Sequence, residues 1–210
     1  MAKGFFITFE GGEGCGKSTH IARLLRHLKD SGRDCISTRE PGGSPLSEKI
    51  RELLLFAKEG ETMSARTEIL LFEAARSQHV AQTIRPALDA GKIVVCDRFF
   101  DSTTAYQGAA RKLSAEDVAY LNAFATDGLE PDLTILLDIP VAVGLGRAEN
   151  RDAGCADRMG SQQLSFYEDV RAAFMRLARE NPHRFAVVSS DGSRDETFAK
   201  IVAAVESRLK

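Results

Sequence analysis

Near the start of the chain, a cluster of glycines is followed directly by a lysine and a serine. Gly11, Gly16 and the pair Lys17-Ser18 match the pattern G-x-x-x-x-G-K-[ST], in which backbone N–H groups surround phosphate oxygens. The lysine ammonium can reach the β- and γ-phosphates of a nucleotide, and the serine hydroxyl suits a Mg²⁺ ion. The pattern therefore predicts a phosphate-binding loop, or P-loop. Nucleotide binding is assigned to all of its residues: Gly11, Gly12, Glu13, Gly14, Cys15, Gly16, Lys17 and Ser18.

Apolar runs surround this loop and recur along the chain. Residues 5–9 predict a buried strand before the glycines, and a helical pattern of leucine and isoleucine follows them. Further apolar runs lie at 35–38, 93–96, 133–137 and 185–188. Five apolar strands that alternate with helices predict a five-stranded parallel sheet with helices on both faces. We therefore expect a three-layer α/β fold of the P-loop NTPase type, as a single domain over residues 1–210.

Two of these strands end in charged residues. Arg39 follows 35–38 and precedes a proline and two glycines, and the pair Asp97-Arg98 follows 93–96. Ligands bind at the carboxyl edge of open parallel sheets, and an ionic pair next to a buried strand needs a partner or a ligand. Arg39 and Arg98 are therefore candidate anion ligands, although Arg39 by itself also fits an ordinary surface arginine.

Side chains that could bind a base lie on two later segments. Phe72 and Arg76 are four residues apart in a helical pattern, so the ring and the guanidinium share one face and could stack on and hydrogen-bond a nucleobase. A phenylalanine at this spacing is more often a core residue. In the segment 99–108, Tyr106 and Gln107 could line a substrate pocket or cap loops.

The segment after the fourth apolar run has a different character. It carries Arg147, Arg151 and Arg158 among small and acidic residues, with little apolar periodicity. A mobile, arginine-bearing segment fits a lid that excludes water and stabilises charge in phosphoryl transfer. We place this lid at about residues 144–160. A solvated charged helix is the alternative.

Composition narrows the class of protein. The chain has 28 basic and 30 acidic residues and a net charge of -2, so we expect no general affinity for a nucleic-acid polymer. The four cysteines lie far apart and form no C-x-x-C pair, which argues against a zinc site or a disulfide framework. The first apolar run is too short for a signal peptide, and no stretch is long enough to span a membrane. We expect a soluble cytoplasmic protein.

Several motifs, in order along essentially the whole chain, carry a family resemblance. They are FEG before the P-loop, TREPGG at 38–43, LLFEAARSQHV at 70–80, DRFFDSTTAYQG at 97–108, LLDIP at 136–140 and DR at 157–158. Together they resemble the bacterial thymidylate kinase family, and several of them separate that family from other P-loop kinases.

The resemblance implies transfer of the γ-phosphoryl group of ATP to dTMP with Mg²⁺, giving ADP and dTDP for dTTP synthesis. It implies that Arg39 and Arg98 hold the dTMP phosphate and that Phe72 stacks on thymine. Arg76 would hydrogen-bond thymine O4, and Tyr106 would press on the sugar and disfavour a 2′-hydroxyl. The residues implied to bind the substrate are Glu13, Arg39, Phe72, Arg76, Arg98, Ser102, Tyr106 and Gln107.

The same resemblance assigns roles in catalysis and in Mg²⁺ binding to charged and polar residues. Glu13 matches a loop carboxylate that approaches the sugar 3′-hydroxyl, Ser18 would bind Mg²⁺, and Asp97 would orient Arg98 or join the Mg²⁺ shell. Because the P-loop contains no arginine, the resemblance places the transition-state arginines in the lid. The implied catalytic residues are Lys17, Asp97, Arg98, Arg147, Arg151 and Arg158.

One lid residue departs from the family pattern. The family lid usually continues D-R-x-E, whereas this chain has Gly160 where that glutamate would stand. The resemblance also implies a homodimer.

Two rival functions remain open on the sequence. A kinase of the same fold could phosphorylate another nucleoside monophosphate or a deoxynucleoside, but it would need a different base-reading surface. A P-loop regulatory switch would hydrolyse nucleotide slowly without an acceptor. The chain contains nothing like the guanine-reading N-K-x-D motif of GTPases.

Overall fold

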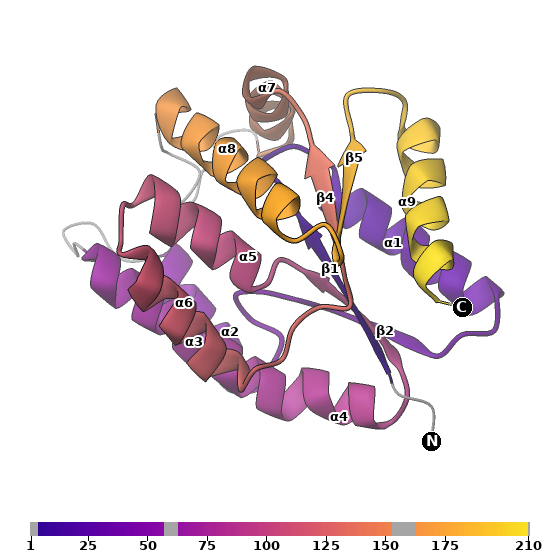
Figure 1. The fold of residues 1–210 in the computed structure, drawn as a ribbon, viewed down its shortest axis with the longest axis horizontal. Coiled ribbons are helices and arrows are strands. Elements are labelled where there is room, and N and C mark those ends of the chain that lie inside the picture. Colours follow the sequence, from indigo (N-terminus) through magenta and orange to yellow (C-terminus); the bar gives the residue numbers. More distant parts are fainter. Residues whose placement is uncertain (1–3, 57–62, 153–162, 210) are drawn as a thin grey trace.

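A computed structural model describes residues 4–56, 63–152 and 163–209 (Figure 1). Its strands form one sheet in the order β2-β3-β1-β4-β5, and all neighbouring pairs are parallel. The strands are β1 (Phe5–Glu10), β2 (Cys35–Arg39), β3 (Ile93–Asp97), β4 (Leu133–Asp138) and β5 (Phe185–Ser189). The predicted strands are therefore confirmed, each to within one or two residues.

The helices connect these strands. The α-helices are α1 (Lys17–Asp30), α2 (Pro45–Leu55), α3 (Ala65–His79), α4 (Arg85–Asp89), α5 (Phe100–Thr103), α6 (Ala115–Thr126), α7 (Val141–Asp152), α8 (Leu164–Glu180) and α9 (Arg194–Arg208). Two π-helical segments, η1 (Val80–Ile84) and η2 (Thr104–Ala110), follow α3 and α5. No helix in the described ranges is long and apolar enough to cross a membrane.

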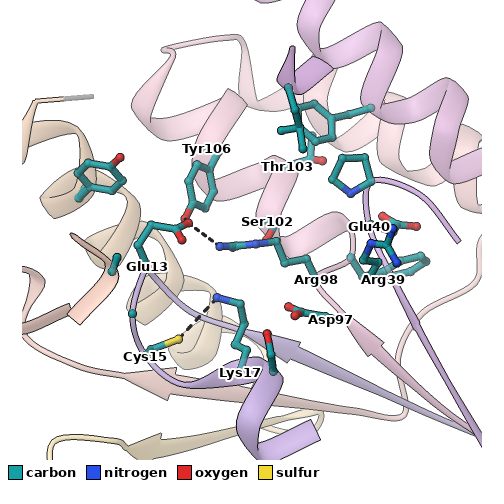
Figure 2. Close-up of a pocket in the computed structure, with 18 of the residues that line it drawn as sticks. Glu13, Cys15, Lys17, Arg39, Glu40, Asp97, Arg98, Ser102, Thr103 and Tyr106 are labelled. Carbon is teal, nitrogen blue, oxygen red and sulfur yellow. Dashed lines mark hydrogen bonds and ion pairs between the residues drawn. The ribbon is translucent and has the colours of Figure 1, made fainter. Parts of the chain in front are cut away.

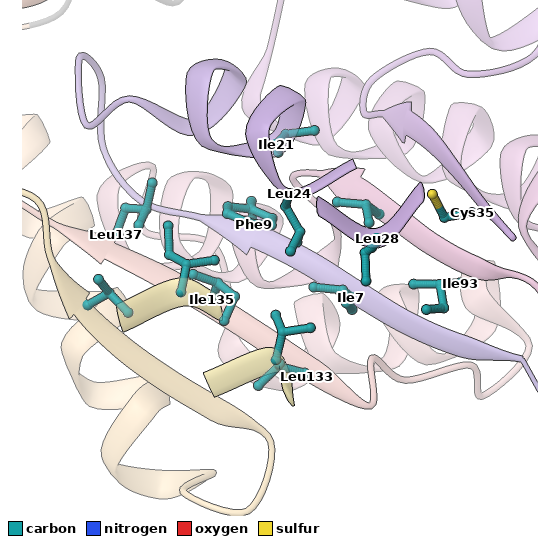
Figure 3. Close-up of a cluster of buried hydrophobic side chains, with 14 of the residues drawn as sticks. Ile7, Phe9, Ile21, Leu24, Leu28, Cys35, Ile93, Leu133, Ile135 and Leu137 are labelled. Carbon is teal, nitrogen blue, oxygen red and sulfur yellow. The ribbon is translucent and has the colours of Figure 1, made fainter. Parts of the chain in front are cut away.

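Alternate residues of the central strand fill opposite sides of the sheet. Ile7 and Phe9 pack with Leu24 and Leu28 of α1, in a cluster that also includes residues of α9 (Figure 3). Phe6 points to the other side and packs in a second cluster formed with η1, α4 and β3. Helices α1 and α9 thus cover one face, and η1, α4 and α8 lie on the opposite face (Figure 1).

The register of the strands places charged residues side by side at one edge. Asp97 at the end of β3 pairs with Arg39 at the end of β2 and with Phe9 of β1. Glu10, the last residue of β1, pairs with Leu136 of β4. The P-loop leaves β1 at this same edge, so parallel pairing alone brings the predicted anion ligands next to the phosphate-binding glycines.

The structure adds detail to two segments of the sequence analysis. The sequence predicts a kink or restart at Pro86, and the structure confirms it, since η1 widens the helix just before Pro86 enters the first turn of α4. Residues 144–152 of the predicted lid are helical, because α7 begins at Val141. Residues 153–160 of that lid lie outside the described residues.

Candidate active site

A pocket of about 750 Å³ opens at the carboxyl edge of the sheet. Its walls come from the P-loop, the ends of β2 and β3, the helices α2, α3, α5, α7 and α8, and the π-helical segment η2 (Figure 2). The predicted site residues that line it are Glu13, Gly14, Cys15, Gly16, Lys17, Ser18, Arg39, Phe72, Arg76, Asp97, Arg98, Ser102, Tyr106 and Gln107. Residues predicted from separate motifs therefore share one cavity.

The P-loop holds its lysine with its own backbone. Lys17 is 9% exposed, and its Nζ donates hydrogen bonds to the carbonyl oxygens of Gly11 and Gly12, each at 3.1 Å. Nζ also lies 3.6 Å from Sγ of Cys15. Lys17 is the first residue of α1, so its ammonium sits beside the positive end of that helix, where an anion is stabilised.

Arg98 connects the P-loop to η2. Its Nη2 donates to Oε1 of Glu13 at 2.7 Å, and its Nη1 donates to the Gly11 carbonyl and to Oγ of Ser102, both at 3.2 Å. The guanidinium lies 5.2 Å from the centre of the Tyr106 ring, and the Tyr106 hydroxyl donates to the same Glu13 oxygen at 3.2 Å. Figure 2 shows this group above Lys17. Arg98 therefore points into the space beside the P-loop.

The other predicted phosphate ligand, Arg39, is held more loosely. Its side chain is 52% exposed, and Nη2 donates to Oε2 of Glu48 at 2.8 Å. The second oxygen of Glu48 accepts the backbone N–H of Gly43 at 2.8 Å. One carboxylate of α2 thus ties Arg39 to the glycine turn that follows β2.

Asp97 pairs with Arg39 in the strand register and precedes Arg98 in the sequence. Its carboxylate is less well satisfied by hydrogen bonds than the two guanidinium groups are. Its Oδ1 is buried and has no hydrogen-bond partner within the described residues, and the residue lines the pocket. The partners of the Arg98 guanidinium are Glu13, Ser102 and Gly11. Among the described residues, these bonds do not include Asp97, so its role in orienting Arg98 or joining the Mg²⁺ shell stays a prediction.

At the far end of the pocket, Arg76 is fixed by a buried network. It is 2% exposed; Nε donates to Glu40 at 2.8 Å, and Nη1 donates to Glu73 at 2.5 Å and to Asn122 at 3.2 Å. Nη2 donates to Oγ1 of Thr103 at 2.9 Å. Of the five guanidinium N–H groups, these bonds leave one on Nη2 without an acceptor in the described part of the chain.

Comparisons with known proteins now bear on this arrangement. The sequence model of the family described as Thymidylate kinase matches residues 9–201. A thymidylate kinase of Geotalea uraniireducens is 49% identical over 210 residues, which cover 98% of each protein. A thymidylate kinase of Caulobacter vibrioides is 49% identical over 209 residues, covering 100% of this chain and 99% of its own.

A solved structure agrees with these sequence matches. The crystal structure of thymidylate kinase from Ehrlichia chaffeensis has a TM-score of 0.78 and 32% identity, and covers 97% of this chain and 99% of that chain. The chain belongs to the thymidylate kinase family. The family resemblance and the P-loop NTPase-type fold expected from the sequence are thereby confirmed.

In this thymidylate kinase family member, Phe72 and Gln107 complete the end of the pocket near Arg76. Phe72 is half-buried and lines the cavity one helical turn from Arg76. Gln107 is 1% exposed, and its Nε2 donates to Oε1 of Glu68 at 2.9 Å. Tyr106 lies beside it on η2, and burial raises the pKa of its phenol above the ordinary range, so this group is a neutral hydrogen-bond donor.

Of the three predicted lid arginines, the structure describes the side chain of Arg147. Arg147 donates from Nη1 to the backbone carbonyl of Ser190 at 3.1 Å, and the residues of α7 that line the pocket are Leu145, Ala148 and Glu149. Arg151 belongs to the last turn of α7, and its side chain is not among the described ones. Arg158 and Gly160 lie outside the described residues. The transition-state role of these arginines stays a prediction.

Close backbone contact joins α7 to the P-loop. Gly14 has φ of +65°, and a Cβ atom built on it would lie 1.9 Å from the carbonyl oxygen of Gly144. A Cβ on Gly144 would in turn lie 2.5 Å from the carbonyl oxygen of Glu13. Both positions need glycine because the two backbones touch. The start of the lid segment therefore rests directly on the loop residue that binds Arg98.

Glu10 and Glu40 belong to the site but were missed by the sequence analysis. Glu40 is 6% exposed and accepts hydrogen bonds from Arg76 and from Nδ1 of His79, the latter at 3.0 Å. Glu10 is fully buried, and burial, assisted by Asp101, raises the pKa of its carboxyl from 4.5 to about 8. Glu10 belongs to the motif FEG and Glu40 to the motif TREPGG. An acidic residue in an otherwise apolar or glycine-rich motif was the sequence feature that could have indicated them.

Proposed function

We propose that this chain transfers the γ-phosphoryl group of ATP to dTMP, forming ADP and dTDP, a step in dTTP synthesis. The observation that carries the proposal is one continuous pocket with Lys17 of the P-loop at one end and the Phe72–Arg76 face at the other. Arg98 lies between them, 2.7 Å from a P-loop carboxylate. A donor nucleotide and a monophosphate acceptor can thus meet at a cationic centre.

The base end of the pocket supports thymine as the acceptor base. Phe72 offers a half-buried ring on which a pyrimidine can stack. Arg76 has one N–H group left, held in a fixed direction, which donates to an acceptor such as O4 of thymine. The exocyclic amino group of cytosine would meet this donor with another donor. Gln107 completes the edge of the base, and Tyr106 presses on the sugar and disfavours a 2′-hydroxyl.

The phosphate end neutralises charge. Arg39 and Arg98 hold the acceptor phosphate, with Ser102 as a further hydrogen-bond partner, and Glu13 approaches the sugar 3′-hydroxyl. A phosphate monoester is a competent nucleophile near neutral pH, so positioning and charge neutralisation suffice and no strong base is required. The lid arginines Arg147, Arg151 and Arg158 would stabilise charge on the transferred group.

The residues present fit a Mg²⁺ ion that arrives with the nucleotide. In the described part of the chain no three His, Cys, Asp or Glu side chains gather as a metal site, and Mg²⁺ in kinases depends on one or two protein oxygens plus substrate phosphates. The exposed Ser18 hydroxyl and, through water, the Asp97 carboxylate are the candidates. Bound Mg²⁺ would neutralise negative charge on the phosphates of the nucleotide.

A panel of acceptors tests the reaction. ADP release from ATP and Mg²⁺ is compared with dTMP, dUMP, dCMP, dGMP, AMP, thymidine and no acceptor. We expect strong turnover with dTMP and weaker turnover with dUMP, because the base end reads an O4 acceptor. Faster turnover with another monophosphate would reassign Phe72, Arg76 and Tyr106. Release that no acceptor stimulates would favour a P-loop switch.

We further propose a cytoplasmic homodimer. Helices α3 and α6 pack together and expose Leu70, Tyr120 and Phe124, which are 55%, 68% and 75% exposed. The two rings stack at 6.3 Å, so burying them in a second copy would remove a large apolar area from water. Light scattering on the wild type and on Phe124→Glu tests this. A monomeric wild type would refute it.

A further inference from the structure

The carboxyl of Glu10 binds the segment that carries Arg98. Glu10 is the last residue of β1 and has no exposed surface. Its Oε1 accepts the backbone N–H of Phe99 at 2.7 Å, and its Oε2 accepts the hydroxyl of Ser102 at 2.6 Å. Among its charged neighbours, Arg98 favours the ionised carboxylate and Asp101 opposes it. A fully buried carboxyl with two short bonds to one segment constrains that segment strongly.

Ser102 passes this constraint on to the arginine side chain. Its hydroxyl donates to Glu10 and accepts from Nη1 of Arg98 at 3.2 Å. A hydroxyl that has given its proton to a carboxylate presents only lone pairs to its other neighbour. Glu10 thereby fixes the direction of the Ser102 hydroxyl, and this direction favours the bond from Arg98.

The backbone around Arg98 depends on the same strand end. Arg98 has φ of +67°, a left-handed conformation that costs free energy for a residue other than glycine and needs support from its surroundings. Its own N–H donates to the carbonyl of Phe9 at 2.9 Å, and the next N–H, of Phe99, donates to Glu10. Successive amides across the strained residue are thus both bonded to the end of β1.

From these contacts we propose that Glu10 is a positioning residue, whose carboxyl holds the Arg98 backbone in its left-handed conformation and, through Ser102, aims the guanidinium at the acceptor phosphate. The proposal rests on the proposed function in one respect, the role of Arg98 in binding the phosphate of dTMP. It replaces Asp97 as the acid that orients Arg98. A purely structural Glu10 would only satisfy the N–H of Phe99 at the start of α5.

Binding experiments separate these two roles because the phosphate is the only part of dTMP that Arg98 is proposed to hold. Affinities for dTMP and for thymidine are measured by calorimetry or competition on the wild type and on Glu10→Gln at about pH 9, above the raised pKa of Glu10, where its carboxyl is ionised. The amide removes the charge and turns the bond to Ser102 around. We expect dTMP to bind about tenfold to a hundredfold more weakly, as for a lost charge-assisted hydrogen bond, and thymidine to bind as in the wild type.

A second background tests whether the effect passes through Arg98. In Arg98→Ala, adding Glu10→Gln should change dTMP affinity by less than about twofold, because the group that Glu10 positions is already gone. Equal losses for dTMP and thymidine in Glu10→Gln, unchanged dTMP affinity, or a full loss in the Arg98→Ala background would each overturn the proposal.

Matched controls guard against effects on folding. Asp132 also accepts a backbone N–H of β1, that of Phe6 at 2.8 Å, but it lies at the opposite end of the strand, so Asp132→Asn should leave both affinities unchanged. If Glu10→Gln fails to fold, Ser102→Ala is compared in the wild-type and Arg98→Ala backgrounds; a loss for dTMP that passes through Arg98 should disappear in the second background, whereas a loss that persists there would overturn the proposal. A wild type that binds and phosphorylates no dTMP would refute the proposed function instead.

Discussion

The two ends of the pocket hold their arginines in opposite ways. At the base end, Arg76 is 2% exposed and donates to Glu40, Glu73, Asn122 and Thr103. At the phosphate end, the side chain of Arg39 is 52% exposed and forms an ion pair with Glu48 of α2.

In the proposed function, this difference separates recognition of the base from neutralisation of the phosphate charge. A guanidinium locked in a buried network keeps its direction without a ligand, so the surface proposed to read the base is already formed. An exposed guanidinium keeps its rotamer freedom until a phosphate orders it. In the proposed function, base recognition would therefore be built into the folded core, whereas the charge that neutralises the phosphate would be completed when the substrate binds. Arg98 is intermediate, since it is fixed by Glu13 and by the chain from Glu10.

The largest expected effect is on folding, at the base end. Arg76→Ala leaves Glu40 and Glu73, which are 6% and 5% exposed, without their cation. Breaking a buried ion pair in this way costs about 3–5 kcal/mol. Urea unfolding of the wild type and the variant measures this loss. A loss below about 1 kcal/mol, typical of an exposed pair, would show that the network does not pre-organise the base end.

A pH-dependent effect on stability is expected at Glu10, the carboxyl that binds the segment carrying Arg98. Folding raises the pKa of Glu10 from 4.5 to about 8, so between these values the folded protein keeps a proton that the unfolded chain has released. The contribution of Glu10 to the free energy of unfolding is therefore complete below about pH 4.5 and is lost as the pH rises through about 8.

Melting temperatures of the wild type and Glu10→Gln, measured from about pH 5 to about pH 9, test this linkage. Gln cannot ionise, so we expect the variant to gain stability relative to the wild type as the pH rises. A difference between the two proteins that stays constant over this range would mean that the Glu10 carboxyl ionises normally in the folded state.

A smaller effect is expected on binding at the base end. Phe72→Ala removes the proposed stacking surface and should weaken dTMP binding by about 1–3 kcal/mol. Because Phe72 is half-buried and outside the network of Arg76, the free energy of unfolding should fall much less than in Arg76→Ala. Calorimetric titration with dTMP measures the affinity. Equal affinity in the variant would exclude stacking on this ring.

The sequence predicted the positions of the site better than its connections. The P-loop, the strand ends at Arg39 and Arg98, and the shared face of Phe72 and Arg76 follow from local spacing, and parallel pairing then brings them to one edge. The strand order could not be read this way, because it depends on contacts between distant segments. Three of the four partners of Arg76 could not be predicted for the same reason, because Glu40, Thr103 and Asn122 come from separate segments, whereas Glu73 is a neighbour on the same helix.

Asp97 and Glu10 illustrate this limit. Asp97 is adjacent to Arg98 in sequence, so sequence reasoning offered it as a partner of that arginine. In the fold, Glu10 supports Arg98 from a residue 88 positions earlier in the numbering, since β1 and β3 pair side by side. Adjacency in the sequence could not show which of the two acids contacts the Arg98 segment, because Glu10 reaches it from a neighbouring strand.

The smallest expected effect on stability is at the phosphate end. Arg39→Ala removes an exposed ion pair with Glu48, and such pairs contribute about 0–1 kcal/mol. The variant should therefore unfold almost like the wild type, yet it should bind dTMP more weakly, because one of the two proposed phosphate ligands is gone. Thymidine, which has no phosphate, should bind both proteins equally. Weaker binding of thymidine would mean that Arg39 supports the base end as well, and the two ends of the pocket would then be coupled rather than separate.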